Sequence, residues 1–504
     1  MIKTIKKFFG CSAGGVANIF AITALPLSLL MGGSIELTHM ELSKRQLSSA
    51  LDAAVLAVAR EITEDQEEAN ALGYAFLQAS LPEDLKDRIT EYNFQITDAD
   101  VTGSASLSVQ HVIFSQLPGI DTVSAHAEAL REAKYVEVAL VLDNTGSMGG
   151  SKISSLRSAA HSLVDILFGD QTYPEYLKVG VVPYVATVNI KNEHFSETWM
   201  DVYALNSRHG ENFDESEGSV NHFTLFNQMG VEWKGCVESR PSGYDVTDDA
   251  PTTTDVETLF VPYLWPDEPP HEGNDHDYDN NYIYDDGLDE DATPAERQAN
   301  AAKYVGGVNT YDETPSNTSG PNKSCPEPLT ALTNDRSRVE SAIDAMDTWN
   351  DGGTNGAVGL KWGWAVLSPG EPFSQGAAYD DDETRKVLVM MTDGENQIWG
   401  GWDNHNKSHY NSYGYLGLEH LGTSSKNSAK AEINDRMLTL CDNIKAQGIQ
   451  IYTITFRVNS SALQDTYEAC ASDPSMYFNS PSDNELKSNF KVIARKIANL
   501  RLTR

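Results

Sequence analysis

The stretch LVLDNTGSMGG, residues 140–150, sets three oxygen-bearing side chains at alternate positions directly after an apolar run. These side chains belong to Asp143, Thr145 and Ser147. A short apolar run that ends in Asp, Asn and Gly is typical of a buried strand followed by a turn. Since Asp, Thr and Ser all favour turns by bonding the neighbouring backbone, the motif alone leaves a simple turn and an oxygen-lined site equally open.

The chain from residue 135 onward alternates apolar strands with amphipathic helices. The predicted strands are YVEVALVLD (135–143), YLKVGVVPY (176–184), RKVLVMMTD (385–393) and IQIYTITF (449–456). The predicted helices are KISSLRSAAHSLVDILFG (152–169), RVESAIDAMDTW (338–349), GAVGLKWGWAVL (356–367), AKAEINDRMLTLCDNIKAQG (429–448) and DNELKSNFKVIARKIANL (483–500). Such alternation indicates an α/β fold, a doubly wound and mostly parallel sheet with helices on both faces. Ligands of these folds bind at the carboxyl ends of strands, where we expect Asp143 and Asp393 to face solvent.

The rest of the chain predicts a domain order. We expect a cytoplasmic tail (1–12), a transmembrane helix (13–35), a membrane-proximal helical segment (36–90), a small β unit (91–133) and the α/β domain (134–504). A large acidic insertion interrupts the α/β domain at about 190–330. Between residues 241 and 296 it has seventeen acidic residues and no Lys or Arg, a composition that predicts little core of its own.

The membrane helix is predicted from Ala13–Ile35, which is almost wholly apolar. At a rise of about 1.5 Å per residue, this segment reaches the ~30 Å thickness of the hydrocarbon core of a bilayer. Lys3, Lys6 and Lys7 precede it, so the positive-inside rule keeps the N-terminus in the cytoplasm and exports the remainder. A signal peptide cleaved after the small residues around Ala21 is the alternative.

Four cysteines lie in the region predicted to be exported: Cys236, Cys325, Cys441 and Cys470. An even number of cysteines outside the cytoplasm favours disulfides, for which three connectivities are possible. We favour the sequential pairing, Cys236–Cys325 and Cys441–Cys470, over four buried thiols.

The net charge of the chain is −36, which excludes nucleic acid as a partner because phosphates would be repelled.

Two further features favour a metal site over a simple turn. Thr354 lies in the glycine-rich stretch DGGTNG directly before a predicted helix, and Asp393 ends another buried strand. The loops at one edge of the sheet would then gather two carboxylates and three hydroxyls, from Asp143, Thr145, Ser147, Thr354 and Asp393. Oxygen ligands of this kind suit Mg²⁺ or Mn²⁺ and leave a coordination position open.

These five residues resemble the metal-ion-dependent adhesion site (MIDAS) of von Willebrand factor A domains, in the same chain order. The resemblance implies that Thr145, Ser147 and Thr354 ligate the metal, and that Asp143 and Asp393 bind it directly or through water. It also implies that the open position takes a carboxylate from a protein partner. Thr145 stands where the family more often has Ser.

Longer stretches resemble TadG-type proteins of tight-adherence (Flp) pilus systems. They include GGVANIFAITALPLSLLMGG (14–33), LDNTGSM (142–148), WKGCVESRP (233–241) and MTDGEN (391–396). The resemblance implies a single-pass protein of the bacterial inner membrane, with most of the chain in the periplasm or outside the cell. It implies adhesion or pilus assembly, with pilus assembly components as partners, and no enzyme activity.

Two alternatives to this function stay open. One is a structural envelope scaffold with a non-functional metal site. The other is a serine hydrolase, which the motif disfavours because Thr145 stands where the nucleophile turn needs glycine.

A second metal, Ca²⁺, is suggested by DHDYDNNYIYDD (275–286). Acidic or amide side chains occupy positions one, three, five, seven and twelve of an EF-hand loop, namely Asp275, Asp277, Asp279, Asn281 and Asp286. Position six is Asn280 instead of the required glycine, so we favour a solvated acidic loop over a calcium site.

Overall fold

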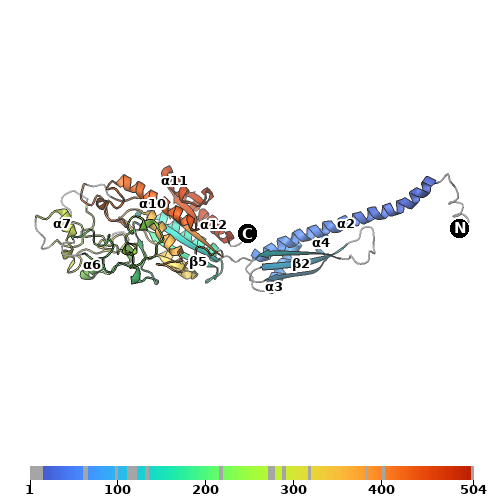
Figure 1. Cartoon of the computed structure of the whole chain (residues 1–504), viewed down its shortest axis with the longest axis horizontal. Coiled ribbons are helices and arrows are strands. Elements are labelled where there is room, and N and C mark those ends of the chain that lie inside the picture. Colours follow the sequence, from blue (N-terminus) through green and yellow to red (C-terminus); the bar gives the residue numbers. More distant parts are fainter. Residues whose placement is uncertain are drawn as a thin grey trace. The chain divides into compact units, whose positions relative to one another are not determined.

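The structure is a computed structural model of the 504-residue chain. It describes residues 15–60, 66–96, 100–109, 122–130, 135–214, 219–270, 278–285, 291–315, 319–381, 383–399 and 403–500. The chain forms two compact units, one up to residue 133 and one from residue 134 (Figure 1).

The first unit packs helices against a small antiparallel sheet. Its helices are α2 (Gly15–Arg60), α3 (Gln66–Ser80) and α4 (Glu83–Lys86), and its strands are β1 (Ile89–Ile96), β2 (Asp100–Ser108) and β3 (Thr122–Leu130), in the spatial order β1-β2-β3. Val55 of α2, Leu77 of α3 and Phe94 of β1 share one buried cluster. A Cβ atom on Gly103 of β2 would lie 2.4 Å from Val55 Cγ2, so α2 lies directly against the sheet.

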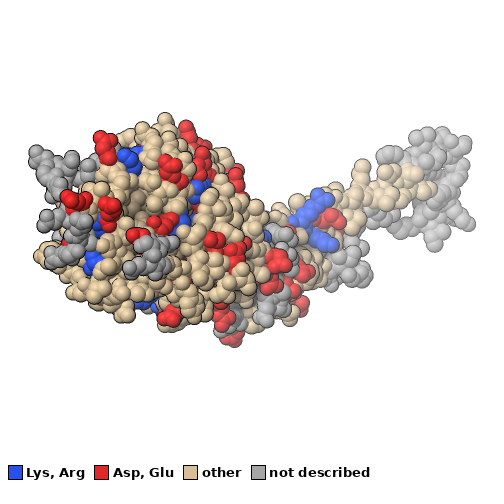
Figure 2. Space-filling view, turned by 60° about the vertical axis from the view of Figure 1, so that its left-hand side comes forward, with Lys and Arg blue, Asp and Glu red and all other residues tan. Residues whose placement is uncertain are grey.

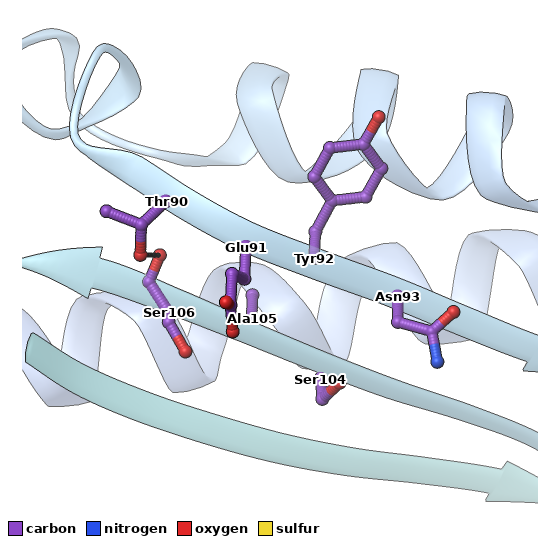
Figure 3. A pocket seen from close by; sticks show the side chains of 7 residues that line it. All are labelled: Thr90, Glu91, Tyr92, Asn93, Ser104, Ala105 and Ser106. Carbon is purple, nitrogen blue, oxygen red and sulfur yellow. Dashed lines mark hydrogen bonds between the residues drawn. The ribbon is translucent and has the colours of Figure 1, made fainter.

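A pocket of about 430 Å³ lies along β1 and β2 of the first unit. Figure 3 shows its lining, which consists of Thr90, Glu91, Tyr92, Asn93, Ser104, Ala105 and Ser106. The Thr90 hydroxyl donates to the Ser106 carbonyl oxygen at 3.2 Å. Glu91 is the single charged residue of this lining, so the pocket lacks the several acidic oxygens of a typical divalent-metal site.

None of the helices in the described part of the chain is both long and apolar enough to cross a bilayer. The span predicted at 13–35 is therefore not confirmed.

The second unit is built on a six-stranded sheet with the order β11-β10-β9-β4-β5-β8. The strands are β4 (Tyr135–Asp143), β5 (Leu177–Tyr184), β8 (Thr330–Thr333), β9 (Thr384–Thr392), β10 (Gln450–Phe456) and β11 (Tyr477–Ser480). Neighbouring strands run parallel except β8, which pairs antiparallel with β5. The mostly parallel sheet expected from the sequence is confirmed, and β4 lies in its interior.

Helices cover both faces of this sheet. On one face are α5 (Ser151–Phe168), α8 (Arg336–Ala345) and α12 (Asp483–Leu500), and on the other are α9 (Gly356–Leu367), α10 (Lys426–Ala446) and α11 (Ser461–Cys470). Val138 and Leu140 of β4 pack with the first group, and Ala139 and Val141 with the second. Because successive side chains of a strand point to opposite faces, burial of both faces explains the continuous apolar run.

In its described residues the insertion between β5 and β8 carries short elements, among them β6 (Val188–Asn189), α6 (His222–Met229), β7 (Cys236–Val237) and α7 (Pro294–Ala299). It nevertheless has a core, in which Tyr263, Trp265 and Tyr282 are fully buried. The expectation of little core is therefore wrong. The acidic groups are accommodated by pairing, since the Lys303 ammonium lies 2.7 Å from a carboxylate oxygen of Asp267.

Both predicted disulfides are present. Cys236–Cys325 joins β7 to the end of the insertion, and Cys441–Cys470 joins α10 to α11.

Acidic side chains are spread over the second unit on the face that Figure 2 shows. This distribution agrees with the net charge of −36 and with a surface that repels phosphate.

Helix α9, which begins just after Thr354, lies against the sheet through two glycines. A Cβ atom on Gly359 would lie 2.8 Å from Tyr184 Cδ1, and one on Gly363 would lie 2.4 Å from Val141 Cγ2. These close approaches fix the distance between α9 and β4, and with it the loop that precedes α9.

Gly363→Ala should destabilise the second unit by up to about 2 kcal/mol, because overpacking against β4, which costs about 1 to 3 kcal/mol, outweighs a gain of roughly 1 kcal/mol in helix propensity. Urea unfolding measures the difference. Gly370→Ala is the control, since the nearest atom to its added Cβ is 3.6 Å away. A Gly363→Ala protein as stable as the wild type would contradict this account of the α9 contact.

Candidate metal centre

Two neighbouring parallel strands bring acidic residues to the same edge of the sheet. Asp143 is the last residue of β4, and Asp393 directly follows the last residue of β9. Their exposed fractions are 0% and 7%. The expectation that these strand ends face solvent is wrong, because polar side chains and loops close over both carboxylates.

Both oxygens of the Asp143 carboxylate accept hydrogen bonds. Oδ1 accepts from the Thr145 amide at 2.9 Å and from the Thr145 hydroxyl at 2.6 Å. Oδ2 accepts from the Thr392 hydroxyl at 2.7 Å. The strand end and the turn that follows it are therefore tied together through one buried carboxylate.

A chain of polar contacts links the two acidic residues. The Thr145 and Ser147 hydroxyl oxygens lie 3.0 Å apart, and the Ser147 hydroxyl donates to Asp393 Oδ1 at 2.5 Å. The Lys152 ammonium, at the start of α5, donates to Asp393 Oδ2 at 2.5 Å. The first loop and the end of β9 are thus joined through polar side chains.

Thr354 is held next to these residues by the loop before α9. Its backbone exchanges two hydrogen bonds with Gln397, at 2.8 and 2.9 Å. The preceding Gly353 has a φ of 98°, and a Cβ atom there would lie 1.9 Å from the Gln397 carbonyl oxygen, so only glycine fits. Asn355 caps α9 by accepting a hydrogen bond from the Val358 amide.

The three predicted hydroxyl ligands, Thr145, Ser147 and Thr354, line one pocket of about 540 Å³. The insertion contributes Lys323 to its wall, and the loop after β9 contributes Trp399. The carboxylates of Asp143 and Asp393 are joined to the pocket through Thr145 and Ser147. The structure therefore brings all five predicted residues together.

The charges in the site favour a cation. Burial, followed by the nearby Asp393 carboxylate, raises the pKa of Asp143 to about 6, although hydrogen bonds from Thr145 and Thr392 act in the opposite direction. Lys152 brings only one positive charge to the pair. A divalent cation would offset the remaining charge, and Mg²⁺ and Mn²⁺ both accept carboxylate and hydroxyl oxygens. The donor set therefore fits the predicted metal.

Two residues of the centre were not predicted. Thr392 and Lys152 each contact one carboxylate, but neither belongs to the alternate oxygen pattern of the first loop. A lysine in the first turn of a helix is usually a surface residue, so no sequence pattern predicts that Lys152 contacts Asp393.

The calcium loop proposed at 275–286 is only partly described. Its first, third and last positions lie outside the described residues: Asp275, Asp277 and Asp286. Asp279 pairs with the Lys323 ammonium at 2.9 Å, and the Asn281 amide donates to the Glu268 carbonyl oxygen at 2.7 Å. The solvated acidic loop therefore stays the prediction, with a calcium site as the alternative.

A second group of metal-ligating side chains was not expected from the sequence. Ligand atoms of Asp279, Asp351 and His409 lie within 4.8 Å of one another. The Lys323 ammonium lies 2.9 Å from the Asp279 carboxylate and 3.2 Å from that of Asp351. This ammonium offsets part of the negative charge of the two carboxylates.

The N-terminal part of the chain matches a known family. Residues 14–61 match the family described as "Putative Flp pilus-assembly TadE/G-like". Among curated proteins, none has a matching sequence.

Three solved structures are similar to this chain at low identity. The von Willebrand factor domain of the type V pili tip protein Mfa5 from Porphyromonas gingivalis is 12% identical, with a TM-score of 0.34, over 74% of this chain and 97% of that one. The pilus adhesin SpaC from Lactobacillus rhamnosus GG is 10% identical, with a TM-score of 0.33, over 82% of this chain and 34% of that one. The proximal thread matrix protein 1 of the mussel byssus, with a zinc-occupied MIDAS motif, is 10% identical, with a TM-score of 0.28, over 72% of this chain and 46% of that one.

This chain therefore spans about a third of SpaC and about half of the mussel protein.

The raised pKa of Asp143 gives metal binding a pH dependence of definite sign. The Asp143 carboxyl binds its proton more tightly in the metal-free folded chain than in the unfolded chain. Its contribution to the free energy of unfolding is therefore complete below about pH 4 and is lost as the pH rises through about 6. Proton and cation compete for the same carboxylate. We therefore expect Mg²⁺ to raise the thermal unfolding midpoint more at about pH 7.5 than at about pH 5.

Thermal unfolding of the full-length chain with magnesium chloride or with EDTA measures this effect. An equal rise at both pH values would show that Asp143 does not titrate at the metal centre.

Proposed function

We propose that this chain is a membrane-anchored, pilus-associated adhesion or assembly protein. Its second unit is proposed to be a von Willebrand factor A-type domain that binds a carboxylate of a protein partner through Mg²⁺ or Mn²⁺. The proposed location is the bacterial inner membrane, with most of the chain in the periplasm or outside the cell. The match of residues 14–61 to a pilus-assembly family supports the pilus context.

One observation carries the proposed binding function. Three loops, each following or preceding a different element of the sheet unit, bring the oxygens of Asp143, Thr145, Ser147, Thr354 and Asp393 to one place. When bound, the metal would supply a Lewis-acidic position for a carboxylate from outside. Thr145, Ser147 and Thr354 line the pocket and would hold the metal, while Asp143 and Asp393 accept hydrogen bonds from the Thr145 and Ser147 hydroxyls.

We also propose that the chain is not an enzyme. The Ser147 hydroxyl donates to the Asp393 carboxylate, which also accepts from Lys152 and is a weaker base than the histidine that commonly activates a serine nucleophile. His161, the nearest histidine along the chain, lies 2.7 Å from the Asp344 carboxylate. These contacts favour a binding site over a hydrolase.

Substitutions in the first loop separate a metal site from a turn. Asp143→Asn keeps the shape and most hydrogen bonds but loses the charge, so it should weaken Mg²⁺ binding by about 100-fold while the unit stays folded. Thr145→Ser keeps the ligating oxygen and should bind metal like the wild type. Thr145→Val keeps the shape and loses the oxygen, so it should bind metal at least about 10-fold more weakly.

Calorimetric titration of Mg²⁺ and Mn²⁺ into the full-length chain measures the affinities, and near-UV circular dichroism confirms the fold. Equal metal binding by the wild type and by Asp143→Asn would refute the proposed centre. Metal binding without any metal-dependent protein partner would favour the envelope scaffold instead.

The proposed anchoring is tested by topology. A reporter that is active only after export, fused behind Arg504, should be active, because the lysines at positions 3, 6 and 7 precede the apolar segment. The same fusion with a reporter that works only in the cytoplasm should be inactive, and the opposite pair of results would overturn the orientation.

A further inference from the structure

We propose that residues 322–327 of the insertion, here called the support segment, belong to the metal centre. They hold the two loops that carry Thr145 and Thr354 in their ligating positions. The inference rests on the proposed function and adds positioning residues that the family motif does not contain. Glu327 and Ser324 are the central ones, and each contacts a different loop.

Glu327 joins the first loop to the second. Its Oε2 accepts a hydrogen bond from the Trp349 indole at 3.0 Å, and the Asn144 side-chain amide lies 3.5 Å from the same oxygen. The Trp349 backbone amide donates to the Asn144 carbonyl oxygen at 2.8 Å, and Thr145 forms a parallel bridge with Trp349. The Glu327 carboxylate therefore fixes Asn144 of the first loop against Trp349 at the start of the second loop.

Ser324 fixes the middle of the second loop. Its hydroxyl donates to the Asn350 carbonyl oxygen at 2.7 Å. A Cβ atom on Gly352 would lie 3.4 Å from Ser324 Cβ, so the loop lies directly on this residue. Asn350 also lies close to the first loop, since a Cβ atom on Gly146 would approach Asn350 Oδ1 to 2.4 Å.

The second loop needs such support because part of its backbone has a conformation that is unfavourable for a residue with a Cβ atom. Asp351, Gly352 and Gly353 all have positive φ angles, of 68°, 68° and 98°. This conformation is disfavoured for Asp351, which has a Cβ atom. Lys323 of the support segment pairs with the Asp351 carboxylate at 3.2 Å and so favours the conformation that places Thr354.

The support segment is itself anchored to residues 232–236 of the insertion. The Cys236–Cys325 disulfide ties it to β7. The Lys234 ammonium donates to the Cys325 carbonyl oxygen at 2.7 Å and lies 3.7 Å from the centre of the Trp349 ring. Asn322 donates to the Glu232 carbonyl oxygen at 2.9 Å.

These contacts matter for ligation because a small divalent cation tolerates little displacement of its ligands. The sheet fixes Asp143 and the position before Asp393, but Thr145 and Thr354 stand on loops beyond the strand ends. A loop ordered before the metal arrives loses less conformational freedom when it binds. The support segment thus raises metal affinity without contributing a ligand.

Glu327→Ala tests the proposal, with Glu327→Gln as the conservative control that keeps an acceptor oxygen. Glu327→Ala should weaken Mg²⁺ binding to the full-length chain about tenfold and accelerate hydrogen exchange at the Trp349 amide of the metal-free protein. Glu327→Gln should restore both properties to near the wild-type values. Equal affinity and equal exchange for Glu327→Ala and the wild type would overturn the proposal.

The two disulfides offer a matched comparison. Replacing both Cys236 and Cys325 by Ser should weaken Mg²⁺ binding, whereas replacing Cys441 and Cys470 should leave it unchanged. Equal weakening by both pairs would mean that the effect is global and would count against the proposal.

Failure of the proposed function gives a different result. A wild-type chain that binds neither Mg²⁺ nor Mn²⁺ would refute the metal centre itself. Exchange at the Trp349 amide in the Glu327 variants would still decide whether the support segment orders the loops.

Discussion

Two carboxylates buried at one edge of the sheet determine the arrangement of the residues around them. The difference between the ordinary pKa of 3.8 and the value of about 6 for Asp143 corresponds to roughly 3 kcal/mol. The pKa stays raised although Asp143 accepts three hydrogen bonds, so these bonds do not fully offset burial and the charge of Asp393. The hydroxyl chain, the ammonium of Lys152 and the predicted divalent cation all respond to this one electrostatic constraint.

The alternation of strands and helices in the second unit was predictable because each element has its own apolar period. Convergence of Asp143 and Asp393 followed from it, since parallel neighbours end at the same edge of a sheet. Strands β8 and β11 were not predicted. Each has four residues and buries only part of its length, so neither produces a clear period. The antiparallel direction of β8 depends on the return path of the insertion, which no local pattern contains.

The insertion is the part of the chain whose packing was predicted wrongly from its composition. Seventeen acidic residues without Lys or Arg between 241 and 296 indicated a poorly packed segment. The structure instead buries Tyr263 and Trp265 there, because the cations that pair with its acidic groups come from outside that range. Lys303 pairs with Asp267, and Lys323 pairs with Asp279. Charge compensation between residues distant in sequence is visible only after folding, and the same reason hid the contacts of residues 322–327 with the metal loops.

The metal and the walls of the pocket would have different roles in the proposed recognition of a partner. A divalent cation held by oxygen ligands attracts any carboxylate, so the metal alone cannot select a partner. The hydroxyl ligands open into a pocket of about 540 Å³ whose walls include Lys323 from the insertion and the half-exposed Trp399. Under the proposed function, an incoming carboxylate would have to stand on a projecting side chain or loop that fits between these walls. Since the strand ends only place the carboxylates, selection among the proposed partners would depend on the insertion and on the loop after β9, the parts that lie outside the repeating α/β pattern.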